Sequence, residues 1–220
     1  MVGIGNRDVK FVVYPIAEEP DGRRLTNWIA EIRVPADQSW KPEDWNRPGR
    51  IEDFLPAFET WRFPWLDIPA LIRSAQAVYE FPMVDRDPLP RWTHGRVPLL
   101  GDAAHPLYPI GSNGASQGII DARTLALQLA THRDPMVALH AYEAIRRPAT
   151  TALLEATRGD GPDVVLDMAE GRAPGGFDDI NAIFPHDERA EIAARYKRLA
   201  GFEPATLNAR PSLNPPRRAA

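Results

Sequence analysis

The stretch GRVPLLGDAAHPLYPIGSNGASQGIIDA, Gly95 to Ala122, decides how this chain is interpreted. It begins with a short apolar run, Arg96–Leu100, which predicts a strand buried on both faces. A Gly-Asp pair and a loop rich in glycine and proline follow, and helical spacing of apolar residues begins after Gly114. The stretch therefore predicts a strand, a polar turn and a helix, an order in which α/β folds commonly place ligands.

Three features of this loop suit a ligand. Gly101 has no Cβ, so a ligand can approach the backbone closely. Asp102 offers two acceptor oxygens, which suit the hydroxyl groups of a sugar or polyol. The helix that opens at Gly114 leaves the N–H groups near Ala115 and Ser116 unpaired, and its dipole favours negative charge there. The loop thus predicts a site for hydroxyl groups and for an anionic oxygen.

Composition narrows the class of protein. The chain has 220 residues, a hydrophobic fraction of 44%, a charged fraction of 25% and a net charge of −4. These values are ordinary for a globular protein and predict no binding to nucleic acid or to an anionic membrane. The absence of cysteine excludes disulfides and thiolate chemistry. No signal-like segment or membrane-length apolar run is found, so a cytoplasmic protein is expected.

The N-terminal part of the chain predicts an antiparallel sheet with short helices against it. Lys10–Ile16 and Arg24–Pro35 are β-rich runs separated by a Pro-Asp-Gly turn, which is typical of a hairpin. In the second run Trp28 shares one face of the strand with Thr26, Ala30 and Ile32, and the residues between them share the other face. Residues 37–75 are rich in Trp and Pro and predict short helices interrupted by prolines. Gln76–Asp85 is a third strand candidate.

The C-terminal part predicts helices. After the helix of the opening stretch, a second helix should have Asp134 as N-cap and Pro135 at its first position, with a kink near Pro148. A short helix is expected after the GDGPD motif. A charged amphipathic helix in HDERAEIAARYKRLAGF should end at Gly201. The Pro-rich segment 204–220 is expected to be a disordered tail.

The long Gly-Asp motif, GRVPLLGDAAHPLYPIGSNGASQGIIDARTLALQL, resembles the second flavin-binding motif of FAD-dependent aromatic hydroxylases, the para-hydroxybenzoate hydroxylase family. Within that family the chain is most similar to the salicylate- and phenazine-hydroxylase-like monooxygenases. The segments KFVVYPI, NWIAEIRVP, YEFPMVDRDPLPRW, YEAIRRPAT and TRGDGPD resemble that branch in the same order. The resemblance covers nearly everything from about Asp8 to Phe202.

The resemblance implies an α/β (α+β) fold that is a partial para-hydroxybenzoate-hydroxylase-like fold. The expected parts are a partial substrate-binding sheet domain (1–92), the C-terminal part of the FAD-binding domain (93–160), C-terminal helices (161–203) and the tail (204–220). The family begins with a strand, a G-x-G-x-x-G turn and a helix, and no such unit is found here. The GIGN sequence at residues 3–6 lacks the preceding strand and the third glycine of that fingerprint.

The resemblance also assigns a cofactor site. Asp102 would bind the ribitol chain of FAD, and the helix N-terminus would face the pyrimidine edge of the flavin and stabilise its anionic reduced form. The Pro-Gly part of the loop would lie close to the ring, where oxygen reacts. The implied cofactor-binding residues are Gly101, Asp102, Pro109, Gly111, Gly114, Ala115 and Ser116.

The family reaction uses NAD(P)H to reduce FAD and O₂ to hydroxylate a small aromatic substrate. That substrate lies between the flavin and the sheet, so Tyr14 and Trp28 are candidates for the pocket wall. Packing within the sheet is the alternative for both side chains. No residue is assigned a catalytic role by the sequence.

Four charged or polar positions have alternative interpretations. Asp102 and His105 can be considered as metal ligands, but a lone pair is weak evidence, and no metal is expected. His105 is better interpreted as a loop residue bonded to the backbone. Arg146 and Arg147 are expected to be surface or helix-end charges.

The chain resembles roughly the C-terminal half of a monooxygenase, which leaves its activity open. A truncated reading frame, a split enzyme with a separate chain that supplies the N-terminal FAD-binding half, and a decayed relative all fit. The function is therefore an FAD-dependent aromatic monooxygenase or its C-terminal half; alternatively, the chain is a non-catalytic remnant or interaction subunit unable to bind FAD alone. Uncovered apolar surface also predicts a homo-oligomer.

Overall fold

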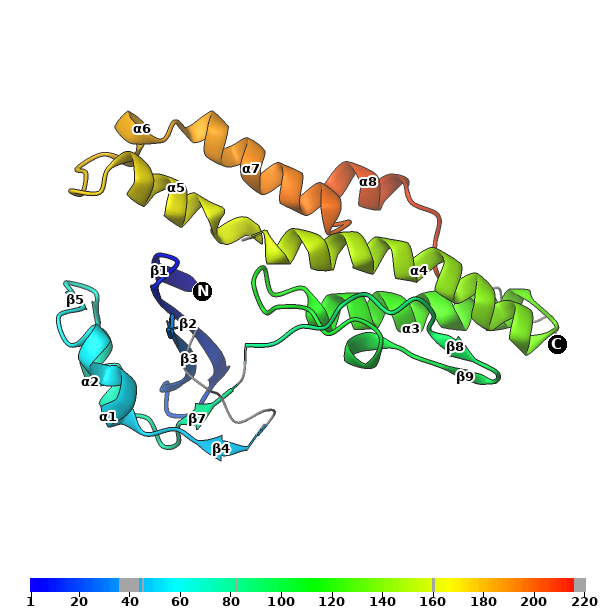
Figure 1. The fold of residues 1–220 in the computed structure, drawn as a ribbon, viewed down its shortest axis with the longest axis horizontal. Coiled ribbons are helices and arrows are strands. Elements are labelled where there is room, and N and C mark those ends of the chain that lie inside the picture. The colour runs from blue at the N-terminus through cyan, green and yellow to red at the C-terminus, as the bar shows by residue number, and fades with distance from the viewer. Residues whose placement is uncertain (36–43, 45, 82, 160, 216–220) are drawn as a thin grey trace. The chain divides into compact units, whose positions relative to one another are not determined.

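The computed structural model describes residues 1–35, 44, 46–81, 83–159 and 161–215 of the chain (Figure 1). The chain forms two compact units, Met1–Pro82 and Met83–Ala220. Each unit has its own cluster of buried apolar side chains. The antiparallel sheet expected from the sequence lies in the first unit, and the Gly-Asp loop with its helix lies in the second.

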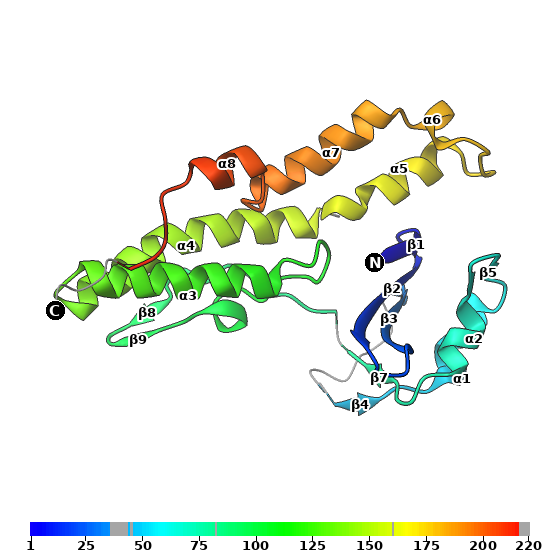
Figure 2. The ribbon, with the colours of Figure 1, turned by 180° about the vertical axis from the view of Figure 1, so that it is seen from behind.

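A three-stranded antiparallel sheet forms the centre of the first unit, in the order β1-β2-β3 (Figure 2). Its strands are Val2–Gly5 (β1), Val9–Glu18 (β2) and Arg24–Ile32 (β3). The expected hairpin of β2 and β3 is confirmed. The sequence did not reveal β1, which turns back onto β2 at Gly5, where φ is +118°. The strand expected over Lys10–Ile16 continues to Glu18 through a register shift between Pro15 and Ala17, because a bulge tolerates proline.

One face of this sheet is buried under short helices. Phe11 is fully buried at the centre of the cluster, with Trp28 and Ala30 on the same face. The helical layer consists of Ile51–Phe54 (α1), the 3-10 turn Leu55–Phe58 (η1) and Ile68–Arg73 (α2). It contributes the buried side chains Phe58, Ile68 and Ile72. Prolines stand at the starts of η1 and α2, as expected for short helices interrupted by proline.

The remaining strands of the first unit have two residues each. They are Arg47–Pro48 (β4), Arg62–Phe63 (β5), Leu66–Asp67 (β6) and Tyr79–Glu80 (β7), paired as β4 with β7 and β5 with β6. The strand expected over Gln76–Asp85 is therefore much shorter, because its partner β4 offers two residues for pairing. Trp40 and Trp45, which belong to the Trp-rich segment, lie outside the described residues.

The second unit begins with a hairpin that leads into the Gly-Asp turn. Thr93–His94 (β8) pairs with Val97–Pro98 (β9) across Gly95. The expected strand Arg96–Leu100 thus contains β9 and no helix, although just two of its residues are paired. The expected burial on both faces is wrong, because Val97 is 64% exposed in this hairpin. The segment continues directly into the 3-10 turn Gly101–Ala103 (η2).

Two long helices lie side by side after this turn (Figures 1 and 2). They are Gly114–Thr131 (α3) and Pro135–Arg158 (α4). Asp134 is the N-cap of α4, as expected, and its side chain accepts from the N–H of Met136 at 2.8 Å. The helix continues through Pro148. None of the described helices combines the length and apolar character that a bilayer-spanning helix needs.

Shorter helices complete the second unit. They are the 3-10 turn Gly161–Asp163 (η3), Val164–Arg172 (α5), Ile180–Ile183 (α6), His186–Leu199 (α7) and Pro204–Ala209 (α8). The end of α7 is as expected: Gly201 has φ of +75°, and the N–H groups of Gly201 and Phe202 donate to carbonyls of the last turn. Helix α8 corrects the expectation of disorder for part of segment 204–220, whose residues 216–220 lie outside the described part.

The boundary between the two units lies between residues 82 and 83, whereas the expected boundary lies between residues 92 and 93. Segment 83–92 lies with the second unit because Arg158 at the end of α4 pairs with Asp85 at 2.6 Å and with Asp87 at 2.9 Å. The hydroxyl of Tyr108 also donates to the carbonyl of Met83 at 2.8 Å. These contacts attach the segment to the region that contains the Gly-Asp loop.

Candidate functional site

The Gly-Asp turn is held by its own backbone and by a carboxylate from α3. Gly101 has φ of +60°, a conformation that favours glycine. Its N–H donates to Asp121 Oδ2 at 3.0 Å, and its carbonyl accepts from the N–H of His105 at 2.9 Å. The backbone on both sides of Asp102 is thereby fixed.

Asp102 lies beside the start of α3. Its side chain is exposed and makes no hydrogen bond or ion pair within the described residues. Its Oδ1 lies 3.9 Å from the point where a Cβ on Gly114 would stand. The carboxylate is therefore positioned by the backbone, and its acceptor oxygens are available to a ligand.

The first turn of α3 presents donors next to this carboxylate. Asn113 is the N-cap, but its side chain makes no capping bond to the helix. The N–H groups of Gly114, Ala115 and Ser116 consequently have no partner within the helix. Ala115 is exposed and Ser116 is half-buried. Acceptor oxygens of Asp102 and backbone donors of α3 thus lie close together.

The loop between these two groups has an unusual backbone. Gly111 has φ of +83°, and Ser112, a residue with a side chain, has φ of +54°. The N–H of Ser112 donates to the carbonyl of the exposed Pro109 at 3.0 Å. A Cβ at Gly111 would lie 2.1 Å from the hydroxyl oxygen of Tyr196, so glycine is required there on two grounds.

A buried polar network supports the turn from below. The carboxylate of Asp121 on α3 accepts from three donors: the N–H of Gly101, His105 Nε2 at 2.5 Å and Arg146 Nε at 2.6 Å. Arg146 Nη2 also donates to Gln117 Oε1 at 2.6 Å. All four side chains are buried. The network therefore joins the Gly-Asp turn to both long helices.

The charge on Asp121 is stabilised by its partners. Burial disfavours the ionised carboxylate and by itself raises its pKa, but hydrogen bonds from His105, Arg146 and the N–H of Gly101 outweigh burial. The pKa of Asp121 is therefore lowered below its ordinary value. A buried carboxylate with this many donors stays charged and holds those donors in place.

One interpretation of the sequence, that of Arg146, is corrected by this network, and the structure adds a side-chain partner to the expected backbone bond of His105. Arg146 is buried and paired with Asp121, not a surface or helix-end charge. The N–H of His105 does bond the backbone, but its ring pairs with Asp121 rather than with Asp102. A signal was present in the sequence: Gln117 and Asp121 are four residues apart, on one helix face, and a polar pair on a buried face requires partners.

His105 has a second ring nitrogen that is buried. Its Nδ1 makes no hydrogen bond to the part of the chain that the structure describes. His105 is one of the residues around a cavity of about 10 Å³ that is also lined by Trp92, Thr150 and Thr151. Among the described residues, no group of three His, Cys, Asp or Glu side chains is placed to hold a metal ion.

The two aromatic candidates for a substrate wall lie in the first unit, on opposite faces of the sheet. Trp28 pairs with Val13 in the register and stacks on Phe11, with ring centroids 5.7 Å apart, in the core under α1. Tyr14 is half-buried on the other face, and its hydroxyl accepts from Asn27 Nδ2 at 2.9 Å. The structure thus supports packing for Trp28 and leaves Tyr14 on the face that does not contact the helical layer.

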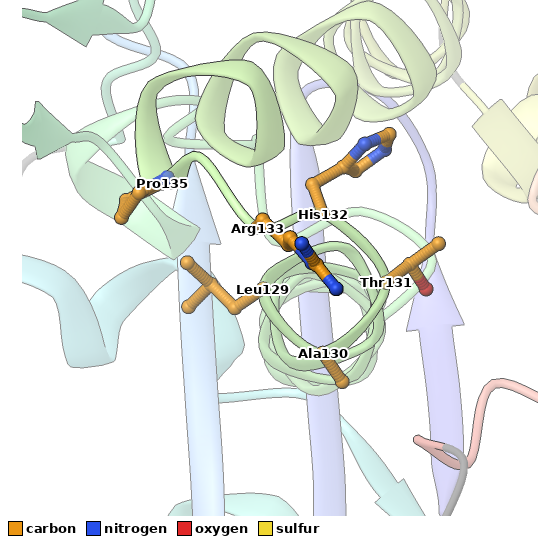
Figure 3. Close-up of a pocket in the computed structure, with 6 residues that line it drawn as sticks. All are labelled: Leu129, Ala130, Thr131, His132, Arg133 and Pro135. Carbon is orange, nitrogen blue, oxygen red and sulfur yellow. The ribbon is translucent and has the colours of Figure 1, made fainter.

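A larger depression lies at the other end of α3 and does not belong to this site. It has a volume of about 460 Å³ and is formed where α3 turns into α4 (Figure 3). The residues around it are Leu129, Ala130, Thr131, His132, Arg133 and Pro135. At 1.5 Å per residue, α3 separates its two ends by roughly 25 Å. The depression therefore cannot share a ligand group with Asp102.

Comparison with known proteins finds a matching domain family for part of the chain, most of it in the second unit. Residues 73–157 match the family described as FAD binding domain. This range contains the Gly-Asp turn, α3, and α4 up to its last residue but one.

Relatives extend the similarity into the first unit. Phenazine 1,6-dicarboxylic acid hydroxylase PhzS of Lysobacter antibioticus is 45% identical over 160 residues, 72% of this chain and 39% of that protein. The 3-amino-4-hydroxybenzoate 2-monooxygenase PtnB3 of Streptomyces platensis is 34% identical over 203 residues, 90% of this chain and 46% of that protein. The chain thus spans less than half the length of both relatives.

A solved structure is likewise matched by this chain over less than half of its own length. The crystal structure of FqzB matches with a TM-score of 0.52 and 25% sequence identity. The match covers 89% of this chain and 46% of that chain. The fold described here accordingly corresponds to part of a longer chain in that protein.

Proposed function

We propose that this chain, a relative of the FAD-dependent aromatic hydroxylases that corresponds to their C-terminal half, supplies one side of the flavin site of such an enzyme. The observation that carries the proposal is the pairing of an exposed, unbonded carboxylate on Asp102 with the open N–H groups at the start of α3. Acceptors suit the hydroxyl groups of a ribitol chain, and donors suit the oxygen-bearing edge of a flavin.

The residues present fit FAD in a second respect. Built onto Gly101, a Cβ would have no atom within 4 Å, so the space above this turn is open. Beside Gly114 the nearest atom to such a Cβ is the Asp102 carboxylate itself. A flat ligand with hydroxyl groups can therefore approach both glycines without moving protein atoms.

FAD, when bound, supplies the redox chemistry that the family uses to transfer one oxygen atom of O₂ to an aromatic ring, with NAD(P)H as the reductant. The chain's own residues bind and orient. Asp102 accepts from hydroxyl groups, and the N–H groups of Ala115 and Ser116 stabilise negative charge at the N-terminus of α3. The resemblance to the family supports a place beside the flavin ring for Pro109 and Gly111, which belong to the loop that leads into α3. The relatives' names support a small aromatic substrate, for which Tyr14 is a better candidate wall than Trp28.

The test is a titration of FAD into the chain and into Asp102→Ala, followed by the quenching of flavin fluorescence. The variant should bind about tenfold to a hundredfold more weakly, because a charge-assisted hydrogen bond contributes about 1.5 to 3 kcal/mol. Its melting temperature should change little, because the carboxylate has no partner in the described residues.

Asp178→Ala is the matched control, since Asp178 is also exposed and has no partner in the described residues. It should leave flavin affinity unchanged. Equal flavin affinity for Asp102→Ala and the parent chain, with a lowered melting temperature, would show that Asp102 serves the fold. A parent chain that binds no FAD would favour a non-catalytic role or a requirement for a separate N-terminal half.

A further inference from the structure

Tyr196 of α7 lies in a slot formed by two glycines that are far apart in the sequence. Its hydroxyl oxygen would be 2.1 Å from a Cβ at Gly111, and its Cε2 would be 3.6 Å from a Cβ at Gly161. Both glycines have positive φ, +83° and +51°. Ile110 Cγ2 lies at the same place, 2.9 Å from the Gly161 position. The absence of a side chain at Gly111 is what admits the phenol ring, whereas a Cβ at Gly161 would be in ordinary contact with the ring and too close to Ile110 Cγ2.

The hydroxyl of Tyr196 bonds to the loop on both sides of Gly111. It accepts from Asn113 Nδ2 at 2.6 Å and donates to the carbonyl of Ile110 at 3.4 Å. The same Asn113 amide donates to the carbonyl of Gly111 at 3.0 Å. Burial raises the pKa of Tyr196, which keeps this hydroxyl protonated as a donor.

A second bond joins the same two helices one turn further on. Gln117 Nε2 donates to the carbonyl of Ala200 at 3.1 Å. Asn113 and Gln117 are four residues apart at the start of α3, and Tyr196 and Ala200 are four apart at the end of α7. Residues with this spacing lie on one helix face. The two bonds therefore form a pair of rungs between the end of α7 and the start of α3.

These rungs are continuous with the buried network beneath the Gly-Asp turn. Gln117, which forms the second rung, accepts from Arg146, and Arg146 donates to Asp121. Asp121 in turn accepts from the N–H of Gly101. A chain of hydrogen bonds thus runs from the end of α7 to the turn that carries the candidate ligand-binding carboxylate.

From this geometry we propose that Tyr196 is a positioning residue that clamps loop 109–113 and the first turn of α3. The loop needs such a clamp because Ser112 has a positive φ, which residues with a side chain rarely adopt unless the surroundings hold them there. The evidence for the clamp is the set of contacts that residues of this chain make with one another. Its use, to hold the donors of Ala115 and Ser116 toward a flavin, rests on the proposed function.

The experiment measures hydrogen exchange of backbone amides in the full chain and in Tyr196→Phe. The variant keeps the ring in its slot and removes the hydroxyl that bonds Asn113 and Ile110. The amides of Ser112 and Gln117, which donate to the carbonyls of Pro109 and Asn113, report on the loop and on the first turn of α3. Both should exchange about fivefold faster, the effect of one lost hydrogen bond on a local opening.

Thr93→Val is the matched control, because Thr93 is also buried and its hydroxyl also donates to a backbone carbonyl, that of Leu139. It should leave exchange at Ser112 and Gln117 unchanged. Asn113→Ala removes the other partner of the Tyr196 bond. The two loop-directed changes combined should then accelerate exchange by less than the product of their separate effects.

Faster exchange confined to the loop and the first turn of α3 supports the clamp. Unchanged exchange in Tyr196→Phe overturns it, and so does an equal acceleration throughout the second unit, which indicates a general loss of stability. Titration of FAD into the same proteins separates the two proposals. A parent chain that binds no FAD shows that this chain does not hold the flavin by itself, while the exchange measurement still decides on the clamp.

Discussion

Asp121 shows at the scale of one residue how a buried charge can serve a site it does not touch. Its side chain has no exposed surface, and its three donors come from the Gly-Asp turn, from His105 and from Arg146. A buried carboxylate is tolerated when its lone pairs are bonded. Removing one member leaves the others buried without compensation.

Asp121→Asn should therefore destabilise the chain strongly. The substitution keeps the shape but replaces one acceptor oxygen with a donor, which faces donors already present, and it leaves Arg146 buried beside a neutral amide. We expect a loss of about 3 to 5 kcal/mol in the free energy of unfolding at pH 7, measured by urea denaturation. Asp178→Asn, an exposed aspartate, should change it by less than about 0.5 kcal/mol.

Comparison of the parent chain with Asp121→Asn should also show how the stability contributed by Asp121 depends on pH. The pKa of Asp121 is lowered in the folded chain from its ordinary value of 3.8, so at acid pH the unfolded chain binds the proton more readily. The stabilisation is present in full above that value and is lost as the pH falls through the lower folded pKa. The difference between parent and Asp121→Asn should shrink from pH 7 to pH 3, and a constant difference would contradict an ionised Asp121.

At the scale of the residue, the sequence was sufficient to predict that Asp102 presents its carboxylate in a turn. The prediction that Arg146 is a surface or helix-end charge was wrong. A Gly-Asp pair after an apolar run places a carboxylate in a turn by local chemistry alone. The environment of Arg146 depends on which face of α4 meets α3. Local spacing does not determine that face when alanine and polar residues surround the position.

Helix ends are the features of the element scale that local sequence determined best. Asp134 caps α4 through the N–H of Met136, and Pro135 follows at the first helical position. Gly201, which follows the C-cap of α7, has a positive φ, as is common after the end of a helix. Caps depend on contacts within four residues, so they can be recognised without knowledge of tertiary packing.

Asp134→Ala should weaken α4 through its first turn. Loss of an N-cap acceptor costs about 1 kcal/mol, so the midpoint of urea unfolding should fall while the slope of the transition stays constant. Asp134→Asn is the control, because its amide oxygen can accept the same hydrogen bond and the midpoint should change little. If both variants lose the same stability, the charge and not the cap is responsible.

Strand lengths at the same scale were poorly determined by sequence. Gln76–Asp85 has a β-rich composition, yet its paired part is β7, because β4 offers two residues. Val2–Gly5 has little strand-like pattern, yet it forms β1 against β2. A strand exists where a partner supplies hydrogen bonds, so its length is a property of the pair rather than of its own residues.

At the scale of the whole molecule the second unit exposes apolar side chains on its helices and hairpin. Ile119 is 63% exposed on α3, and Val97 is 64% exposed on β9. Ile120 and Leu125 are half-buried, and Leu125 packs against the cluster of Trp92 and Tyr142. Exposed apolar surface of this kind favours association.

The chain should therefore self-associate as its concentration rises. Ile119→Gln should raise the apparent dissociation constant about tenfold in sedimentation velocity, since burial of an isoleucine side chain contributes about 1.5 to 3 kcal/mol. Asp178→Asn, an exposed position between α5 and α6, is the control and should have no effect. A chain that stays monomeric over a wide concentration range contradicts this expectation.

The sequence by itself determined the hairpin of β2 and β3, the long α3 and α4 with the N-cap of α4, and the order of strand, Gly-Asp turn and helix in the second unit. Each of these depends on contacts within a few residues or on a regular period. Tertiary structure alone decided that Arg146 and Gln117 lie under the turn and that Trp28 and Tyr14 lie on opposite faces. It also placed Tyr196 against Gly111, 85 positions earlier in the chain. Such contacts arise from the packing of elements distant in sequence, where burial and hydrogen bonding select partners that no local pattern specifies.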